Sequence, residues 1–494
     1  MQTGPVQTET QFAGYEQALR YVLSLTDYER AARLRHHAAS YDLTRMRRLC
    51  AELGNPQDAL PAIHVAGTKG KGSVTTMAAY LLAGGGLRVG FYTSPHLVDI
   101  RERISVVEPA ADSRPVAGRC VSQEEFVVTL NRMRPVLERF AGGVKRGHKP
   151  FSPAGESIAR DPFFSADHPT FFELMTALAF SYFAALPADV AALEVGLGGR
   201  LDATNVVTPA AAALRACAIT SIGLDHTAIL GETVELIAAE KAGIIKPGVP
   251  VISSPQSPGV ERVIRAIAAE RGSPAWFVGK EIQLHGRQIN GRWPRRWEIA
   301  VRTPARTLGP MMCPLLGRHQ ATNLAVALGL VDRLIDSGVR VDVSRLATGL
   351  ERTIWPGRLE VRSRRPWFVL DGAHTVESLC AVLTTLPETF NYRRLIVVVG
   401  CMADKDLPGM MGQLANFASE VVLTRSDHPH SADPAELADR LSLAGPMIPR
   451  HVEPDGGAAV ALALRIAGPD DLVLVTGSMY LVGLVERLAG RGGE

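Results

Sequence analysis

The pattern of apolar and polar residues predicts strands that alternate with helices along most of the chain. Short apolar runs are separated by stretches in which apolar residues recur at helical spacing. The first candidate strands are Ala62–Ala66, Arg88–Tyr92, Val190–Val195, Ala216–Thr220 and Val249–Ser253. Because alternating strands and helices form parallel strand pairs, this order favours an α/β fold with a mostly parallel sheet. Two helices are predicted before the first strand, between Tyr15 and Leu53.

The pattern breaks around Trp355-Pro356-Gly357 and then starts again, which indicates a second, smaller α/β domain. Its candidate strands are Trp367–Leu370, Leu395–Val399, Glu420–Thr424 and Leu472–Thr476. We therefore predict a first domain over residues 1–352, a linker at 353–358 and a second domain over 359–494. Two stretches rich in Pro, Gly, Ser and charge, near 108–118 and 142–166, are predicted to be surface insertions of the first domain.

Composition excludes several classes of protein. The chain has 494 residues, 46% hydrophobic and 21% charged, as expected of a globular enzyme. Its 53 basic and 50 acidic residues are mixed along the chain, which gives no indication of a nucleic-acid surface. The N-terminus has no basic, apolar leader and no run reaches membrane-spanning length, so we expect a cytoplasmic protein without a membrane partner. Six scattered cysteines form no CxxC pair and predict neither a zinc site nor disulfides.

The segment that follows the first strand has the features of a phosphate-binding loop. It reads Gly67-Thr68-Lys69-Gly70-Lys71-Gly72-Ser73 and leads into a helical stretch from Val74 to Ala83. Its glycines allow successive backbone amides to point at phosphate oxygens. In such a loop Lys71 contacts the β- and γ-phosphates, and the Ser73 hydroxyl can bind Mg²⁺. The spacing is unusual, because Gly72 separates the lysine from the serine.

Three further segments place polar residues at the expected carboxyl edge of the sheet, where ligands of parallel α/β proteins gather. Glu194 ends an apolar strand and precedes a glycine-rich turn, so it is positioned to hold a metal near the phosphates. His226 follows another strand and, beside Glu194 and Ser73, is a candidate metal ligand. Lys241 shares a helical face with apolar residues, and a lysine buried in this way needs a partner or a changed charge state.

Taken together, these motifs resemble the folylpolyglutamate synthases and dihydrofolate synthases of the Mur ligase superfamily. The resemblance runs from about Tyr15 to Gly483 and rests on an ordered set of segments. These are HVAGTKGKGS, TSPHL, RERI, EVGLGGRLDATN, LDHTAILGETVELIAAEKAGI, HQATNLAVAL, WPGRLE, LDGAH and TGSMYLVG. The family architecture implied is a phosphate-loop domain followed by a smaller, Rossmann-like α/β domain.

The resemblance implies roles for particular residues. In the first domain, ATP would be bound by Gly67, Thr68, Gly70, Lys71, Gly72 and Ser73, and Mg²⁺ by Ser73, Glu194, His226 and a carbamate on Lys241. Asn323, Arg358 and Asp371 would also contact ATP, with Asp371 coming from the second domain. Catalytic roles are implied for Lys71, His226, Lys241 and His374. The folate site would include Asp202, which is similar to the family residue near the pterin, together with Ser94 and Arg103.

The reaction implied is ATP-dependent ligation of L-glutamate to a folate. The substrate carboxylate would attack the γ-phosphate of ATP, and the glutamate amine would displace phosphate from the resulting acyl phosphate. Because carboxylate and triphosphate repel each other, cations must neutralise their charge. The expected cofactors are ATP and Mg²⁺, the expected substrates are tetrahydrofolate and glutamate, and dihydropteroate is a second candidate acceptor. The family resemblance also favours a monomer.

Two positions depart from the common bacterial pattern. Lys69 stands where GTNGKGS has asparagine, and Thr375 stands where DGAHN has asparagine. Both resemble the eukaryotic, polyglutamate-adding branch, whereas GRLDATN resembles the bacterial, often bifunctional branch.

Two alternative functions remain open at this point. One is a Mur-type ligase that acts on a cell-wall precursor, although little chain precedes the loop at Gly67 for the extra N-terminal domain of such enzymes. The other is a phosphate-loop protein that hydrolyses nucleotide without ligation, which would not need Arg358, Asp371 and His374.

Overall fold

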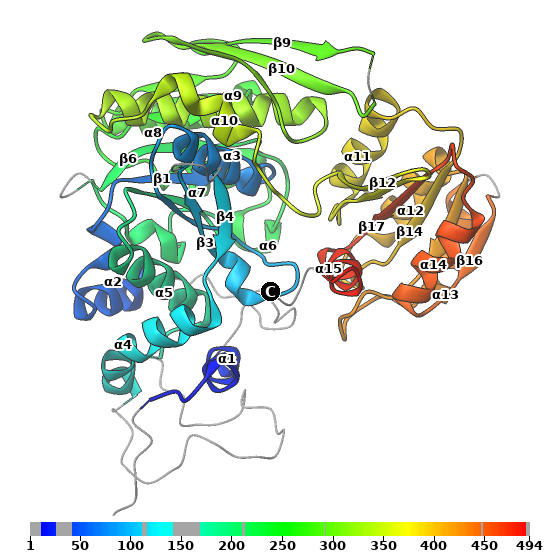
Figure 1. The fold of residues 1–494 in the computed structure, drawn as a ribbon, viewed down its shortest axis with the longest axis horizontal. Helices are drawn as coiled ribbons and strands as arrows, with labels where there is room; N and C mark the ends of the chain where they lie inside the picture. The colour runs from blue at the N-terminus through cyan, green and yellow to red at the C-terminus, as the bar shows by residue number, and fades with distance from the viewer. Residues whose placement is uncertain are drawn as a thin grey trace, which may run out of the picture. The chain divides into compact units, whose positions relative to one another are not determined.

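The protein is described from a computed structural model, which covers residues 11–25, 42–110, 116–141, 168–209, 213–291, 293–445 and 448–490. It divides into two compact units (Figure 1). The first comprises Met1–Ser94, Arg103–Phe277 and Gly329–Asp342, and the second comprises Pro95–Glu102, Val278–Leu328 and Val343–Glu494. The linker predicted at 353–358 therefore lies within the second unit.

The first unit is built on an eight-stranded sheet in the order β4-β3-β2-β5-β1-β6-β7-β8. Its strands are β1 (Ala62–Ala66), β2 (Val89–Tyr92), β3 (Ile104–Glu108), β4 (Ala117–Cys120), β5 (Val190–Glu194), β6 (Leu214–Ile219), β7 (Val251–Ser253) and β8 (Ala275–Phe277). Strands β2, β5, β1, β6, β7 and β8 are mutually parallel, and β3 and β4 extend the sheet antiparallel. The prediction of a mostly parallel sheet is confirmed.

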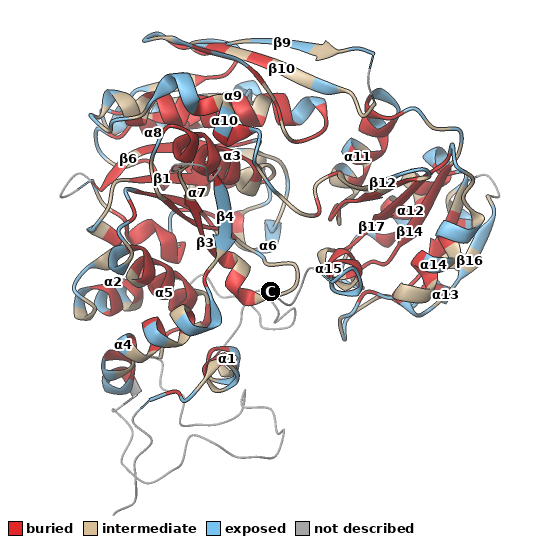
Figure 2. Ribbon diagram, viewed as in Figure 1, coloured by how far each residue is buried: buried red, intermediate tan, exposed pale blue. Residues whose placement is uncertain are grey.

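The central strands are apolar because the sheet is covered on both faces. Every residue of β1, β2 and β5 is buried, and they form the buried centre of the unit in Figure 2. The register pairs Val65 with Glu194 and Ala66 with Ile219. The loops that leave β1, β5 and β6 therefore emerge side by side at one edge of the sheet.

The helices of the first unit are α1 (Tyr15–Ser24), α2 (Leu43–Glu52), α3 (Lys71–Gly84), α4 (Gln123–Ala141), α5 (Phe171–Ala185), α6 (Thr227–Leu230), α7 (Val234–Ala242) and α8 (Pro258–Glu270). Helix α3 packs on β1, β2, β3 and β5. Helix α5 begins with a capping box, in which Thr170 and Glu173 each bond the other's backbone N–H. No helix in the described part of the chain is long and apolar enough to cross a membrane.

The second unit contains a six-stranded sheet in the order β12-β13-β17-β14-β15-β16. The strands are β12 (Glu360–Arg364), β13 (Trp367–Leu370), β14 (Leu395–Val399), β15 (Glu420–Leu423), β16 (Arg450–Val452) and β17 (Leu472–Thr476), and all but β12 run parallel. Apolar clusters cover both faces. Helices α11 (Val376–Thr389), α12 (Leu407–Phe417) and α13 (Pro434–Ala444) contribute to one cluster, and α14 (Gly456–Ile466) and α15 (Met479–Leu488) to the other.

A separate antiparallel sheet of three strands, which the sequence pattern did not predict, also belongs to the second unit. It consists of β9 (Gln283–Ile289), β10 (Arg296–Arg302) and β11 (Thr307–Met312). Two bonds tie it to the end of α11, one from the Gln288 side chain to the Glu388 carbonyl and one from Arg295 N to the Thr389 carbonyl. Helices α9 (Arg318–Asp336) and α10 (Leu346–Leu350) follow it along the chain.

Of the two predicted insertions, residues 108–118 form the connection between β3 and β4, with 111–115 outside the described residues. Gly118 of β4 packs against Tyr80 so closely that a Cβ there would collide with the Tyr80 hydroxyl. This stretch thus includes an edge strand of the first sheet. The second predicted insertion, 142–166, lies outside the described residues.

Candidate active site

The phosphate loop runs from the end of β1 into the first turn of α3, as the sequence predicts. Two of its glycines have positive φ, +151° at Gly67 and +93° at Gly70, the latter being the residue before the helix. A side chain at Gly67 would collide with the hydroxyl of Thr220, the residue directly after β6. Ser73 is buried in the first helical turn, where N–H groups without helical partners favour an anion.

The first half of this loop is bonded to the loop that follows β6. Thr68 N and Lys69 N both donate to the Ser221 carbonyl, at 2.9 and 3.2 Å. The Thr68 hydroxyl donates to Gly223 O and accepts from Gly223 N, both at 3.1 Å. The amide and hydroxyl of Thr68, a residue predicted to bind ATP, therefore hold the two loops together. The amides from Gly70 onward are left to face an anion.

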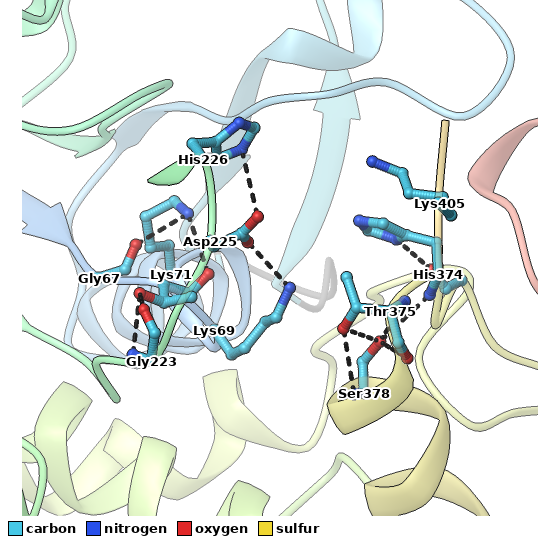
Figure 3. Close-up of polar contacts among 12 residues, drawn as sticks. Gly67, Lys69, Lys71, Gly223, Asp225, His226, His374, Thr375, Ser378 and Lys405 are labelled. Atoms are coloured by element: carbon cyan, nitrogen blue, oxygen red, sulfur yellow. Dashed lines mark hydrogen bonds and ion pairs between the residues drawn. The ribbon is translucent and has the colours of Figure 1, made fainter. Parts of the chain in front are cut away.

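Lys69 extends this connection with an ion pair. Its ammonium lies 3.1 Å from Asp225 Oδ2, and His226 Nε2 lies 3.7 Å from Asp225 Oδ1 (Figure 3). His226 has φ +51° and an exposed side chain, so its ring is aimed by the backbone of the loop rather than by packing. Asp225 was missed in the sequence analysis, although its place directly before His226 and the extra cation at Lys69 were available signals.

Two lysines converge on one carbonyl oxygen. Gly67 O accepts from Lys71 Nζ at 3.1 Å and from Lys241 Nζ, which comes from α7, at 2.9 Å. Burial, together with the positive charge of Lys71, lowers the pKa of Lys241 to about 7. Burial also lowers the pKa of Lys71, while the charge of Glu194 opposes that shift. The pair concentrates positive charge, at reduced hydration, at the mouth of the phosphate loop.

Glu194 supplies a carboxylate at the same edge. It ends β5, is 4% exposed, and its Oε2 accepts from Ser94 N at 3.2 Å. Ser94, predicted to border the folate site, thus lies beside the predicted metal ligand. Among the described residues, no group of three or more His, Cys, Asp and Glu side chains could hold a metal ion. The predicted set contains only two such side chains, Glu194 and His226, with a serine hydroxyl and a lysine carbamate as the other donors.

Asp202 is held in place by its own loop. Its Oδ2 accepts from Leu197 N at 2.8 Å, and its Oδ1 accepts from Thr204 N at 3.0 Å and from the Thr204 hydroxyl. These bonds fix the turn that follows β5 and leave Asp202 only 6% exposed. Arg103, also predicted at the folate site, is buried with its guanidinium 5.1 Å from the centre of the Phe171 ring.

In the second unit, Asp371 organises the turn that carries Arg358. Its Oδ2 accepts from Leu359 N and its Oδ1 from Ala373 N, both at 2.9 Å. Leu359 has φ +46°, a conformation that is strained for leucine and that the bond to Asp371 helps to retain. Burial raises the pKa of Asp371, whereas the charge of Arg358 lowers it. The Arg358 guanidinium donates to Gly357 O at 2.9 Å.

The remaining predicted residues of this unit lie on two other segments. His374 Nδ1 lies 2.8 Å from Gly372 O (Figure 3), and Thr375 begins α11 with a capping box to Ser378. The threonine that departs from the bacterial pattern is therefore a good helix cap. Asn323, on α9, is buried, and its side-chain amide donates to Gln320 Oε1 at 2.9 Å.

Comparison with known proteins gives the same assignment as the motifs. The chain is 32% identical over 442 residues to the dihydrofolate synthase/folylpolyglutamate synthase of Bacillus subtilis, covering 89% of this chain and 93% of that protein. The chain belongs to this family. Residues 357–479 also match the model of the Mur ligase, glutamate ligase domain, which places the family in the Mur ligase superfamily.

Two further relatives define the extent of the similarity. A probable bifunctional folylpolyglutamate synthase/dihydropteroate synthase of Haloferax volcanii is 36% identical over 449 residues, which are 88% of this chain and 47% of that protein. The chain thus spans about half the length of that relative. The solved structure of Mycobacterium tuberculosis folylpolyglutamate synthase complexed with ADP and AMPPCP has a TM-score of 0.77 and 30% identity, and covers 92% of this chain and 96% of that chain. The Mur ligase architecture predicted from the sequence is confirmed.

Proposed function

We propose that this protein ligates L-glutamate to a folate at the expense of ATP, through an acyl phosphate formed on the folate carboxylate. The observation that carries the proposal is the family match along nearly nine-tenths of the chain, to a relative whose name contains both folate activities. The site geometry supports it: a phosphate loop, two lysines of reduced hydration and a buried carboxylate meet at one edge of the sheet.

ATP is the proposed nucleotide, as the complex of the Mycobacterium relative with ADP and AMPPCP suggests. In the first unit the amides of Gly70 to Ser73, the helix dipole of α3 and the Lys71 ammonium would receive the phosphates. In the second unit Arg358, fixed by the turn around Asp371, adds a cation suited to phosphate, and Asn323 adds an amide for the nucleotide.

Mg²⁺ is the proposed metal, and the donor set fits it. Ser73 and Glu194 offer oxygen atoms, which Mg²⁺ prefers, and His226 is the proposed third ligand. Bound there, the ion would neutralise charge on the phosphates during transfer. The chain's own part is to orient the Glu194 carboxylate, through the bond that its Oε2 accepts from Ser94 N.

Carbamylation of Lys241 follows from the same electrostatics. Reaction with CO₂ requires the neutral amine, and a pKa of about 7 makes that form abundant at neutral pH. The carbamate would also replace a repulsion between the cations Lys71 and Lys241 by an attraction. His374, in the second unit, is the proposed catalytic histidine of the LDGAH segment, with its ring oriented by Gly372 O.

Phosphate release measured with ATP and glutamate, with tetrahydrofolate or dihydropteroate as acceptor, tests the function. Glutamate-dependent release with tetrahydrofolate is the expected result, and release with dihydropteroate as well would establish the second activity. Hydrolysis of ATP that needs neither glutamate nor acceptor would instead support the phosphate-loop hydrolase. Turnover only with a cell-wall precursor would support another Mur-type ligase.

The same proposal includes a monomeric, cytoplasmic enzyme whose partners are small molecules, with neither nucleic acid nor membrane required. It is supported by the mixed charge, with a formal net value of +3, and by the family membership. Light scattering of the purified protein with and without ATP tests the monomer directly.

A further inference from the structure

A buried histidine lies behind the phosphate loop and outside every role assigned above. His64 is the central residue of β1, and its side chain is fully buried in the sheet. Its Nε2 lies 2.7 Å from the Thr204 hydroxyl oxygen. The same hydroxyl bonds to Asp202 Oδ1 at 2.5 Å, so His64, Thr204 and Asp202 form a continuous chain of hydrogen bonds.

The direction of each bond in this chain can be deduced. Asp202 accepts a backbone N–H bond at each of its oxygens, from Leu197 N at Oδ2 and from Thr204 N at Oδ1, so both oxygens act as acceptors. An ionised carboxylate can only accept, so the single proton of the Thr204 hydroxyl must be donated to Asp202. The hydroxyl oxygen must then accept from His64, whose Nε2 carries the proton. Its Nδ1 has no hydrogen-bond partner among the described residues, as expected for the unprotonated nitrogen.

This assignment requires a neutral imidazole, and its surroundings keep it neutral. Burial, together with the charge of Lys246, lowers the pKa of His64 to about 3. At any pH at which the protein functions, the ring is therefore a fixed N–H donor rather than a titrating group. A fixed donor inside the sheet gives the Thr204 hydroxyl one orientation, and Thr204 gives one orientation to the Asp202 carboxylate.

We propose that His64 is a positioning residue, which acts through Thr204 to hold the Asp202 carboxylate in the orientation that receives the folate acceptor. This inference rests on the proposed function, in which Asp202 contributes to the folate site. Through His64, strand β1 then connects the phosphate loop that follows it to the acceptor side of the site. Without the His64 donor the Thr204 hydroxyl can rotate, and Oδ1 of the carboxylate then keeps the bond from Thr204 N but loses the one from the hydroxyl.

The test uses two amides of similar size that differ in where the donor lies. Glutamine places its amide nitrogen where His64 has Nε2, so His64→Gln retains the donor to Thr204. Asparagine places its amide nitrogen where the ring has Nδ1, so His64→Asn removes that donor while keeping a polar, neutral side chain. Thr204→Val removes the middle of the chain with little change of volume.

Steady-state kinetics of the full chain with ATP, glutamate and tetrahydrofolate distinguish a positioning role from a general structural one. His64→Asn and Thr204→Val are expected to raise the KM for tetrahydrofolate by about tenfold, the effect of losing one bond to a charged group. The KM for ATP should change by less than about twofold, and His64→Gln should restore the KM for tetrahydrofolate. Combining His64→Asn with Thr204→Val should cost no more than Thr204→Val alone.

Several outcomes would overturn the inference. A parallel rise of both KM values, or equal impairment by the glutamine and asparagine variants, would reduce His64 to a packing residue. If His64→Asn unfolds in a thermal melt, Thr204→Val carries the same test, and a normal KM for tetrahydrofolate in that variant contradicts the inference. Absence of glutamate-dependent turnover in the unaltered chain would overturn the proposed function and this inference together, whereas turnover with the wrong KM pattern overturns the inference alone.

Discussion

The phosphate loop of the first unit and the turn around Arg358 in the second unit bury groups of opposite charge. In the phosphate loop, Lys71 and Lys241 share one carbonyl, and the pKa of each is lowered by burial. In the turn, a buried carboxylate, Asp371, is satisfied by two backbone N–H groups and lies within the field of Arg358. The loop is thus organised for an anion that must be supplied, whereas the turn is organised by an anion of its own.

This contrast predicts which substitutions reduce activity and which reduce the stability of the fold. The pKa values of Lys71 and Lys241 are lowered because burial disfavours their charge, so removal of one of these lysines relieves a desolvation cost and the fold should tolerate it. Removal of the buried carboxylate leaves two N–H groups without acceptors, so the fold should not tolerate it. The predictions that follow test this contrast, from the largest expected effect to the smallest.

Lys241→Ala should abolish ligation and leave the fold intact. Loss of a group that stabilises developing charge at a dry site costs on the order of a hundred- to thousandfold in rate. The phosphate-release assay measures this loss, and a urea titration should show no loss of stability. Lys246→Ala, which removes a lysine from the residues just beyond the same helix, is the matched control and should retain activity. Near-normal activity of Lys241→Ala without added bicarbonate or acetate would exclude the carbamate.

Asp371→Ala should have the opposite effect to Lys241→Ala and mainly lower the stability of the fold. The loss of acceptors for Leu359 N and Ala373 N, at a turn with a strained leucine, is expected to cost about 2–4 kcal/mol of unfolding free energy. The KM for ATP should rise as well, because Arg358 loses the turn that orients it.

Urea unfolding of Asp371→Ala, compared with Asp371→Asn, measures that cost. Asparagine keeps one acceptor oxygen and should lie between the alanine variant and the unaltered protein. If Asp371→Ala were as stable as the unaltered chain, the turn would not depend on its carboxylate, and the contrast between the two regions would be lost.

The sequence predicted the buried part of this architecture well. Strands β1, β13, β14 and β17 begin and end at the predicted residues, because a strand buried on both faces is a short apolar run bounded by polar residues. The strands β9 to β11 were not predicted. These strands are not continuous apolar runs, because charged residues such as Arg287 and Glu298, which pair across β9 and β10, lie within them.

The site was predictable where a single segment determines it. The glycine conformations of the phosphate loop and the burial of Lys241 both follow from local patterns. The Thr68 hydroxyl bonds Gly223, 155 positions away, and the amides of Thr68 and Lys69 bond Ser221, so no local pattern in the loop indicates that these groups are already occupied. The chain His64–Thr204–Asp202 was missed for the same reason, since 140 positions separate the first two residues.

The ion pair between Lys69 and Asp225 gives the smallest expected effect and the sharpest test of the contrast. It is the acid–base contact of the phosphate loop most like that of the turn, but its side chains are 39% and 24% exposed. Water and salt screen a pair of that kind, so a double-mutant cycle of Lys69→Asn and Asp225→Asn should give a coupling of about 0.2–1 kcal/mol in urea unfolding. The coupling should shrink further when the ionic strength is raised. A coupling above about 2 kcal/mol, independent of salt, would be the behaviour of a buried pair. The phosphate loop would then depend on a carboxylate of its own, as the turn around Arg358 does, and the two regions would no longer be opposites.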